Sequence, residues 1–211
     1  MSPRRAKAIS GRVGDDPATA LREHLIEVAE KMLAERQVSA ITTRDIARAA
    51  GVSDGVLYNY FADKSDLLIT ALARRFTRLV KQFDTDLPAP GTGEVVDNLQ
   101  TYALAVLELN ADALPLFAGL LSEPALLQRF LAAIHDEPYG PQVYQQRVAE
   151  YLAAEQELGR IGPVDLIATT TLFTGASILL ALTGQVAGTA RTELAGQLPA
   201  VVRTLVGGLA P

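Results

Sequence analysis

Residues 42–61, TTRDIARAAGVSDGVLYNYF, carry the clearest pattern of local structure in the sequence. Thr42, followed three positions later by Asp45, is typical of a capping box, in which both side chains satisfy free backbone N–H groups where a helix begins. Gly51 suits the left-handed turn that ends a helix, because it has no Cβ atom. Ser53 is of a type that often caps the next helix. The spacing therefore predicts two short helices joined by a tight turn.

The remaining residues of this stretch indicate that the two helices cross as a helix-turn-helix. Ala47 is small where the second helix must come close, and Val56 and Leu57 offer apolar contacts that would lock the crossing. A helical hairpin inside an all-α core would use similar residues and stays an alternative. The second helix is short and polar for such a core, and side chains with polar tips crowd its end: Tyr58, Asn59, Tyr60 and Lys64. This favours DNA binding.

The longer run TTRDIARAAGVSDGVLYNYFADKSDLL, residues 42–68, resembles the DNA-binding region of the TetR (tetracycline-repressor) family of transcriptional regulators. Its most specific part is LYNYFADK at 57–64, together with the two leucines at 67 and 68. The resemblance covers residues 21–72 closely and a layout of nine or ten helices more loosely. It implies that the third helix enters the major groove and that the fourth transmits motion from a ligand-binding domain.

The resemblance also implies which residues contact DNA. Thr43, in the first turn of its helix, would hold a phosphate, and Arg44 matches a position that reaches a base edge such as guanine O6 and N7. Tyr58 matches a contact to the DNA backbone and thymine methyl groups, and Tyr60 and Lys64 match phosphate clamps. The exposed face of the recognition helix completes the predicted set with Ser53, Asp54, Gly55, Val56 and Asn59.

Two positions depart from the family pattern. Gln37 stands where a glycine commonly ends the first helix, which predicts a looser turn or a strained residue. Asp54 stands where a basic or neutral side chain is frequent. A carboxylate there repels phosphate, although it can accept a hydrogen bond from cytosine N4. The operator sequence of a relative therefore does not transfer to this protein.

The charge is distributed unevenly along the chain. The formal net charge is −5 over 211 residues, but residues 1–83 hold fourteen Lys/Arg and ten Asp/Glu, a net of +4. Residues 84–211 hold five Lys/Arg and fourteen Asp/Glu, a net of −9. A basic front and an acidic rear would orient the molecule toward a polyanion.

The residue types needed for most catalytic or metal sites are scarce. There is no cysteine, and the two histidines, His24 and His135, stand isolated, which predicts structural roles rather than zinc binding. No nucleophile elbow, phosphate-binding loop or dinucleotide fingerprint is found. Neighbouring acids such as Glu155 and Glu157 are interpreted as solvated helix ends. The sequence therefore predicts neither an enzyme nor a bound cofactor.

Helical spacing dominates, which predicts an all-α fold: a three-helix DNA-binding domain followed by a helical domain for ligand binding and dimerisation. The predicted regions are a basic tail at 1–17, the DNA-binding domain at 18–63, a connecting helix at 64–86 and the helical domain at 87–211. The segment 87–93, LPAPGTG, is the expected boundary. Later helices are expected at 94–110, 113–121, 123–135, 141–158, 163–184 and 192–207, with a kink at Pro199 in the last one.

The segment 164–184 has a single charge, Asp165, and is near the length of a membrane span. Its five threonines and the lack of flanking Lys/Arg clusters favour a buried helix of a cytoplasmic protein. Ala168, Thr171 and Gly175 fall on one stripe of it, which would let a second helix approach closely. Either a dimer face or close packing within one subunit would use such a stripe. The TetR resemblance, which implies a four-helix dimer interface, favours the homodimer.

Large side chains of the middle helices are candidates for an effector pocket: Tyr102, Phe117, Leu120, Phe130, Tyr144 and Phe173. For any single one of them, core packing is the better explanation, whereas together they could line a pocket. Few charges accompany them in sequence (Glu108, Asp112, Glu123 and Arg129), which favours an uncharged, lipophilic effector. The leading hypothesis is thus a dimeric repressor that a small molecule releases from a near-palindromic operator. A DNA-binding structural or adaptor protein without an effector is the alternative, and whether the protein represses or activates is left open.

Overall fold

The structure, a computed structural model, describes residues 16–135 and 140–207. Of the predicted basic tail at 1–17, only the last two residues lie inside the described part, and Pro17 already begins the first helix. All regular elements of the described residues are helices, with no strand among them. This confirms the predicted all-α class. By internal contacts the chain forms two units, which are described separately.

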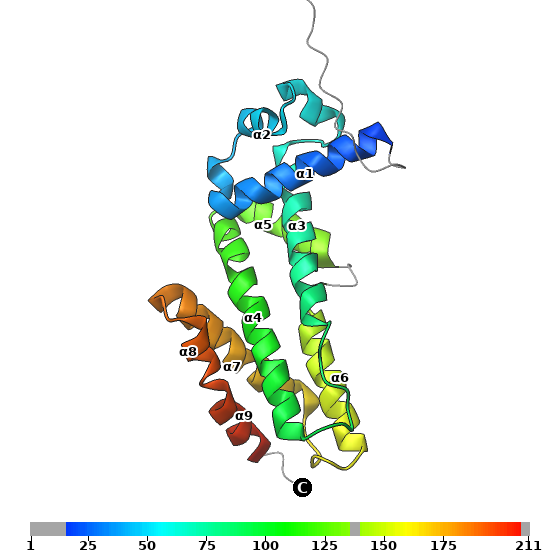
Figure 1. Ribbon diagram of the computed structural model, residues 1–211, viewed down its shortest axis with the longest axis vertical. Helices are drawn as coiled ribbons and strands as arrows, with labels where there is room; N and C mark the ends of the chain where they lie inside the picture. Colours follow the sequence, from blue (N-terminus) through cyan, green and yellow to red (C-terminus); the bar gives the residue numbers. More distant parts are fainter. Residues whose placement is uncertain (1–15, 136–139, 208–211) are drawn as a thin grey trace, which may run out of the picture. The chain divides into compact units, whose positions relative to one another are not determined.

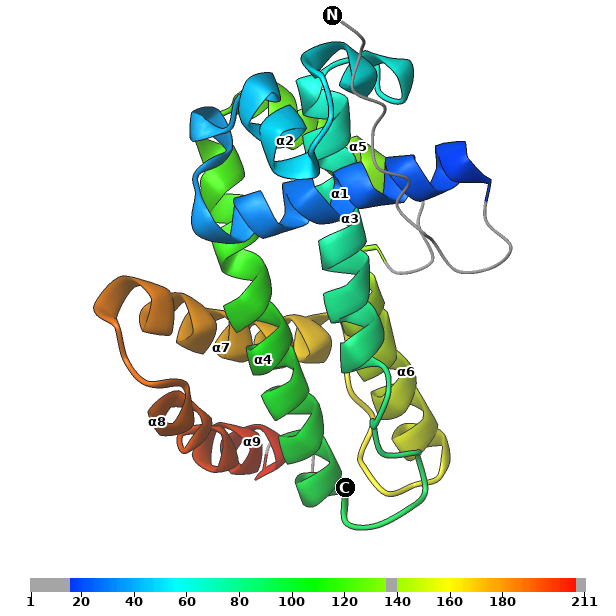
Figure 2. The ribbon, with the colours of Figure 1, turned by 45° about the horizontal axis from the view of Figure 1, so that its top comes forward.

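Unit 1 comprises the residues up to Arg75 together with Gly119–Ala133. Its helical elements are α1 (Pro17–Glu35), η1 (Val38–Ala40), α2 (Thr43–Ala50), η2 (Asp54–Asn59), the first part of α3 (Lys64–Phe83) and most of α5 (Pro124–His135). The α1 helix packs against α2, and α2 against η2 (Figures 1 and 2).

The core of unit 1 follows the helical spacing of its sequence. The α1 helix buries Leu25, Val28 and Ala29 on one face, as its spacing predicts. Two polar contacts fix α1 in place: the Arg74 guanidinium of α3 lies 2.6 Å from the Glu23 carboxylate, and His24 Nε2 donates to the Ala50 carbonyl at the end of α2 (3.3 Å). His24 thus has the structural role that the sequence predicts.

Unit 2 comprises Phe76–Ala118 and the residues from Ile134 onward. It contains the end of α3, most of α4 (Val95–Leu121), α6 (Val143–Glu157), α7 (Leu166–Ala187), α8 (Arg191–Ala195) and α9 (Leu198–Gly207). The α7 helix packs against α6, α8 and α9, and α8 and α9 lie beside it in both views (Figures 1 and 2). Its core includes the tilted ring pair Tyr102 and Tyr151, with centroids 4.8 Å apart.

A buried ion pair fixes the connection between α3 and α4. Glu155 of α6 has no exposed surface, and its carboxylate accepts from the Gly91 backbone N–H (3.0 Å) and lies 3.3 Å from Arg160 Nε. Arg160 also donates to the Gly93 carbonyl. The interpretation of Glu155 as a solvated helix end is therefore wrong: its burial is tolerated because a cation and a backbone N–H compensate the charge. Glu157 is exposed, as predicted.

The helices predicted at 94–110 and 113–121 are one continuous helix, α4, with Pro115 inside it. A proline has no N–H, so the carbonyl four residues earlier loses its helical partner. That carbonyl belongs to Ala111, and Gln185 of α7 donates to it through Nε2 (3.0 Å). A long-range side-chain hydrogen bond therefore replaces the missing backbone bond, which local sequence patterns do not reveal.

Of two further turn predictions, the kink at Pro199 is corrected, whereas at Gln37 the looser turn, one of the two predicted outcomes, is found. The helix predicted at 192–207 is divided into α8 and α9, and Pro199 stands as the second residue of α9, where its missing N–H costs nothing and no kink results. Gln37 is not strained: its φ is −63°, because α1 ends in an extended residue, Arg36, rather than in a left-handed turn.

Two helices, α4 and α7, are long and apolar enough to cross a membrane by length and composition. On this criterion the core helix of a soluble protein qualifies equally. The α7 helix buries one face, which includes Phe173 and Ala181, and exposes the other, which includes Ile167 (82% exposed) and Val186 (80% exposed). The expected burial of this helix thus holds for only one of its sides.

We predict that the Gln185–Ala111 hydrogen bond matters because of Pro115. Gln185→Ala should lower the free energy of unfolding by about 1 kcal/mol, the usual contribution of such a bond. In a Pro115→Ala background, the restored N–H would satisfy the carbonyl, so the same Gln185→Ala change should cost less. Urea unfolding of the four proteins measures this coupling. An equal cost of Gln185→Ala in both backgrounds would contradict the assignment.

Candidate functional site

The capping box that begins α2 is present as the sequence predicts. Thr42 Oγ1 accepts from the Asp45 N–H (3.2 Å), and Asp45 Oδ2 accepts from the Thr42 backbone N–H (3.2 Å) and hydroxyl (2.6 Å). The Thr42 side-chain hydrogen bond, followed by its backbone N–H, lowers the pKa of Asp45 below its ordinary value of 3.8. At the other end of α2, Gly51 has φ +71°, the left-handed conformation expected of it.

The second helix of the motif is a 3₁₀ helix, η2, rather than an α-helix. Its first residues, Asp54 and Gly55, are poor helix formers, and its six residues give few α-helical hydrogen bonds. Ser53 precedes it but makes no side-chain capping bond, contrary to prediction. The Ser53 backbone carbonyl instead accepts from the Val56 N–H at 3.0 Å. The turn is therefore closed by the backbone, which leaves the Ser53 hydroxyl on the surface.

The outer face of η2 is exposed, whereas its inner face is anchored. Leu57 is fully buried, and Val56 is half-buried. Tyr58 is 57% exposed, which is unusual for a large aromatic side chain. The other exposed residues of the predicted contact set on this face are Ser53, Asp54, Gly55 and Asn59.

An ion pair links the two helices on their outer side. Arg44 Nε, in the first turn of α2, lies 3.5 Å from Asp54 Oδ2, in the first turn of η2, and both side chains are largely exposed. The acidic residue that departs from the family pattern is therefore partly neutralised by the arginine that the pattern assigns to a base edge. An exposed pair of this kind contributes little stability, but it restricts where both side chains point.

Three further predicted contact residues are only half-exposed: Thr43, Tyr60 and Lys64. Lys64 begins α3, and its ammonium donates to the Ile41 carbonyl at 2.8 Å. A lysine ammonium has three donor hydrogens, so this bond leaves two for another acceptor. Lys64 thus fixes the approach to α2 and still reaches the surface.

Arg48 is a surface residue of α2 that the sequence reasoning did not include. It is exposed and lies four residues after Arg44, which places both on one side of the helix. The i, i+4 spacing of the two arginines was a signal that could have identified it. The face of unit 1 near α2 therefore holds two exposed guanidinium groups.

The six residues predicted to line an effector pocket divide between the two units. Leu120 and Phe130 belong to unit 1 and are fully buried, whereas the other four belong to unit 2. There, Tyr102 pairs with Tyr151, Phe117 packs edge-on against Phe76, and Tyr144 packs edge-on against Phe83, while Phe173 is buried. None of the six lines the groove that unit 2 does contain.

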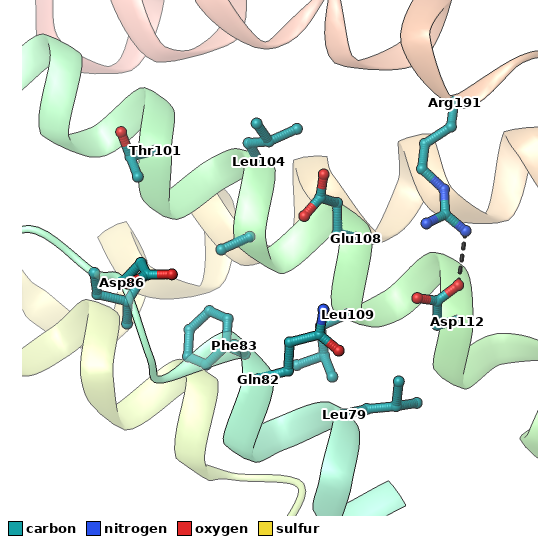
Figure 3. A pocket seen from close by; sticks show the side chains of 12 residues that line it. Leu79, Gln82, Phe83, Asp86, Thr101, Leu104, Glu108, Leu109, Asp112 and Arg191 are labelled. Atoms are coloured by element: carbon teal, nitrogen blue, oxygen red, sulfur yellow. Dashed lines mark hydrogen bonds and ion pairs between the residues drawn. The ribbon is translucent and has the colours of Figure 1, made fainter. Parts of the chain in front are cut away.

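This groove lies between the end of α3 and the middle of α4 (Figure 3) and has a volume of about 470 Å³. Its α3 side is formed by Leu79, Gln82 and Phe83, with Asp86 and Leu87 after the helix. Its α4 side is formed by residues on one face of the helix: Thr101, Leu104, Ala105, Glu108, Leu109 and Asp112. Arg191 of α8 completes it.

The predicted small-residue stripe of α7 faces outward. Ala168, Thr171 and Gly175 are all exposed, and a Cβ atom added at Gly175 would meet nothing within 4 Å. The stripe continues along the helix with exposed apolar side chains at three- and four-residue spacing: Leu172, Leu179, Leu182 and Val186. Close packing of this stripe within the described part of its own chain is therefore excluded.

Comparison with known proteins agrees with this geometry. Residues 25–71 match the model of bacterial regulatory proteins of the tetR family. The chain is 47% identical over 47 residues to the HTH-type transcriptional repressor KstR2 of Mycobacterium tuberculosis, a match that covers 22% of this chain and 24% of that protein. Matches to curated relatives of this kind span between about a fifth and about half of the relatives' own lengths.

The fold is shared over nearly the whole chain. A TetR-family transcriptional regulator from Mesorhizobium loti superposes with a TM-score of 0.74 at 16% identity, covering 93% of this chain and all of that one. The regulator FadR from Bacillus subtilis, solved with stearoyl-CoA, superposes with a TM-score of 0.58 at 18% identity, covering 88% and 98%. Residues 25–71 thus match the amino-terminal domain of tetR-family regulators, and the chain as a whole shares the fold of these solved structures.

We predict that the Asp45 carboxylate stabilises unit 1 only while it is ionised. Because its pKa in the folded protein is lowered, its contribution should be present above the ordinary value of 3.8 and should disappear as the pH falls through the lowered value. Asp45→Asn should therefore lower the urea midpoint at neutral pH and converge with the unchanged protein in acid. Glu157→Gln serves as the control. A gap that stays constant or widens as the pH falls below 3.8 would contradict this role.

Proposed function

We propose that this protein is a sequence-specific DNA-binding transcriptional regulator, a homodimeric repressor that a small molecule releases from its operator. The observation that carries the proposal is the outer face of α2 and η2. It presents a paired arginine and an exposed tyrosine, Arg44 and Tyr58, on two short helices held by a left-handed glycine turn. The core of unit 1 does not use these side chains, so a function outside the core explains their exposure.

The chemistry of this face fits the major groove of double-stranded DNA. A guanidinium at Arg44 can donate two hydrogen bonds to guanine O6 and N7. Asp54 next to it can accept from cytosine N4, so the pair would read adjacent base pairs. Thr43 at the start of α2, with Tyr60 and Lys64, would hold phosphates, and Arg48 would add a further positive charge.

The exposed stripe of α7 supports a homodimer. Ala168 and Gly175 would let two copies of the helix approach closely, and the apolar side chains around them need cover from water. A two-fold axis through this stripe would make the interface self-complementary. Two recognition helices would then lie about 34 Å apart, and the operator would be nearly palindromic.

Release by an effector is the regulatory part of the proposal. The FadR structure was solved with stearoyl-CoA, and the groove of unit 2 offers this chain a place for a ligand of its own. The α3 helix runs without a break from unit 1 into unit 2, so a ligand that changes its end in unit 2 acts on the helix that Lys64 begins. The ligand must bind one conformer better than the other, because equal affinity shifts no equilibrium.

The alternative is a DNA-binding structural or adaptor protein on the same fold, without an effector. It would present the same DNA-binding face and dimer stripe but would have no use for a groove of about 470 Å³. The groove therefore favours the regulator. In both readings the protein acts in the cytoplasm, where the DNA is.

We predict that mutations will distinguish the residues that contact bases from those that contact phosphates. Arg44→Ala should reduce the preference for one base pair of the operator, at a cost of about 1–3 kcal/mol. Lys64→Ala should weaken binding to all sequences and reduce the salt slope of log K by about one unit. The measurement selects bound sequences from random DNA and then follows the affinity of each variant as a function of salt concentration.

The salt slope is used for Lys64 because a loss of its bond to Ile41 would destabilise the fold without changing the number of phosphates contacted. Tyr58→Phe tests the same DNA-binding face with a smaller risk to the fold. Tyr58 is exposed, and its hydroxyl makes no hydrogen bond within the described part of the chain. The assignment fails if Arg44→Ala and Lys64→Ala have equal effects on operator and random DNA.

We also predict that Gly175→Glu converts the dimer into a folded monomer. A Cβ atom at this position would meet no described atom within 4 Å, and glutamate favours a helix over glycine by roughly 0.5–1 kcal/mol, so the monomer should not lose stability. Two carboxylates at the two-fold axis would repel each other. Sedimentation velocity and thermal unfolding measure the outcome, and Gln145→Glu, at an exposed position of α6, is the control. A Gly175→Glu protein that remains dimeric would exclude this stripe as the interface.

A further inference from the structure

The groove in unit 2 has apolar side chains on its inner surface and charged side chains at its rim. Its inner surface includes apolar side chains: Phe83 and Leu109 are buried beneath it, and Leu79 is half-buried. Phe83 is held edge-on against Tyr144, with ring centroids 6.4 Å apart, so this part of the surface is fixed by packing. Such a surface favours the binding of an apolar group of an organic ligand, because contact between the two removes apolar area from water.

The rim carries carboxylates. Asp86, Glu108 and Asp112 line the groove, and Arg191 is the only cation among the lining residues that the structure describes. Arg191 is already engaged, because its guanidinium donates to Asp112 Oδ1 at 2.7 Å (Figure 3). Asp86 and Glu108 make no ion pair or side-chain hydrogen bond within the described ranges. The groove therefore has a formal net charge of −2, all of it uncompensated on these two residues.

The position of the charges relative to the apolar surface matters. Glu108 and Asp112 are one helical turn apart on α4, on the face that also carries Thr101 and Leu104. From Thr101 to Asp112 this face extends for about 16 Å at the helical rise per residue. Asp86 stands on the opposite side, just after α3. Carboxylates thus stand on both sides of a groove that is long enough for a drug-sized molecule.

We propose that this groove binds an amphipathic organic cation, a molecule with an apolar body and one positively charged nitrogen or phosphonium group. The body would lie on Phe83, Leu79 and Leu109, and the charge would lie between Asp86 and Glu108. The volume of about 470 Å³ falls within the range of known small-molecule sites, roughly 300–1,000 Å³. This keeps the lipophilic character that the sequence favours for the effector and adds a charge.

Other ligand classes fit the groove less well. An anionic amphiphile would bring like charges toward Asp86 and Glu108, which is repulsive. An uncharged lipid would cover the two carboxylates without compensating them, and such desolvation is unfavourable. A cation is the class that gains from the carboxylates as well as from the apolar surface.

Binding itself is independent of DNA, whereas the role of the bound cation as an effector rests on the repressor function proposed above. The two can fail separately. If the protein binds the cation but no DNA, the repressor function is excluded and the cation site is retained. If the protein binds DNA but not the cation, only the cation site is excluded.

Tetraphenylphosphonium and tetraphenylborate are suitable probes because they are nearly equal in size and shape and opposite in charge. Isothermal titration of the full-length protein, without DNA, measures the Kd of each. Tetraphenylphosphonium should bind, and higher salt should weaken it. The combined variant Asp86→Asn with Glu108→Gln should weaken the cation by about two- to fivefold for each carboxylate removed, and it should not weaken the borate.

Glu157→Gln is the matched control, because it removes an exposed carboxylate of unit 2 that does not line the groove. It should leave the Kd of tetraphenylphosphonium unchanged. Circular dichroism and thermal unfolding confirm that each variant is folded, which is expected since both replaced rim side chains are exposed. The proposal is overturned if tetraphenylphosphonium does not bind, or if it binds the double variant as tightly as the unchanged protein.

Discussion

The left-handed turn at Gly51 is the constraint on which the DNA-facing part of this protein depends. A helix of eight residues and a 3₁₀ helix of six are both too short to be stable alone. They persist because the turn sends the chain back at a fixed angle, so that Ala47 and Leu57 are buried together in unit 1. Every outward side chain of the motif takes its direction from this arrangement.

The sequence predicted best where the cause of a structure is local. The capping box at Thr42 and Asp45, the glycine turn and the buried face of α1 each depend on residues within one or two turns of each other. Ser53 shows the limit of such reasoning, since its residue type favours a cap but the backbone closes the turn without it. The 3₁₀ form of η2 was likewise outside what the residue types could distinguish.

Features that depend on distant partners could not be predicted. Pro115 looked like a helix boundary because the donor that compensates for it, on Gln185, stands seventy-four residues beyond the Ala111 carbonyl that it satisfies. Glu155 looked solvated because its cation and its backbone partner come from other segments. The six residues predicted to line a pocket are absent from the lining of the groove in unit 2 for a related reason: large aromatic residues bury the most area and therefore fill cores. The groove is instead lined mainly by leucines, charged residues and Phe83 on the facing sides of α3 and α4, which the predicted set did not include.

The carbonyl of Ala111 has an implication for how this sequence can change over generations. With Pro115 present, an amide donor at position 185 is needed, and without the proline the helix supplies its own. The two positions are therefore expected to covary among relatives of this protein, although they lie on different helices and belong to no functional site. A mutational path that replaces the glutamine first passes through a less stable intermediate, whereas one that replaces the proline first does not.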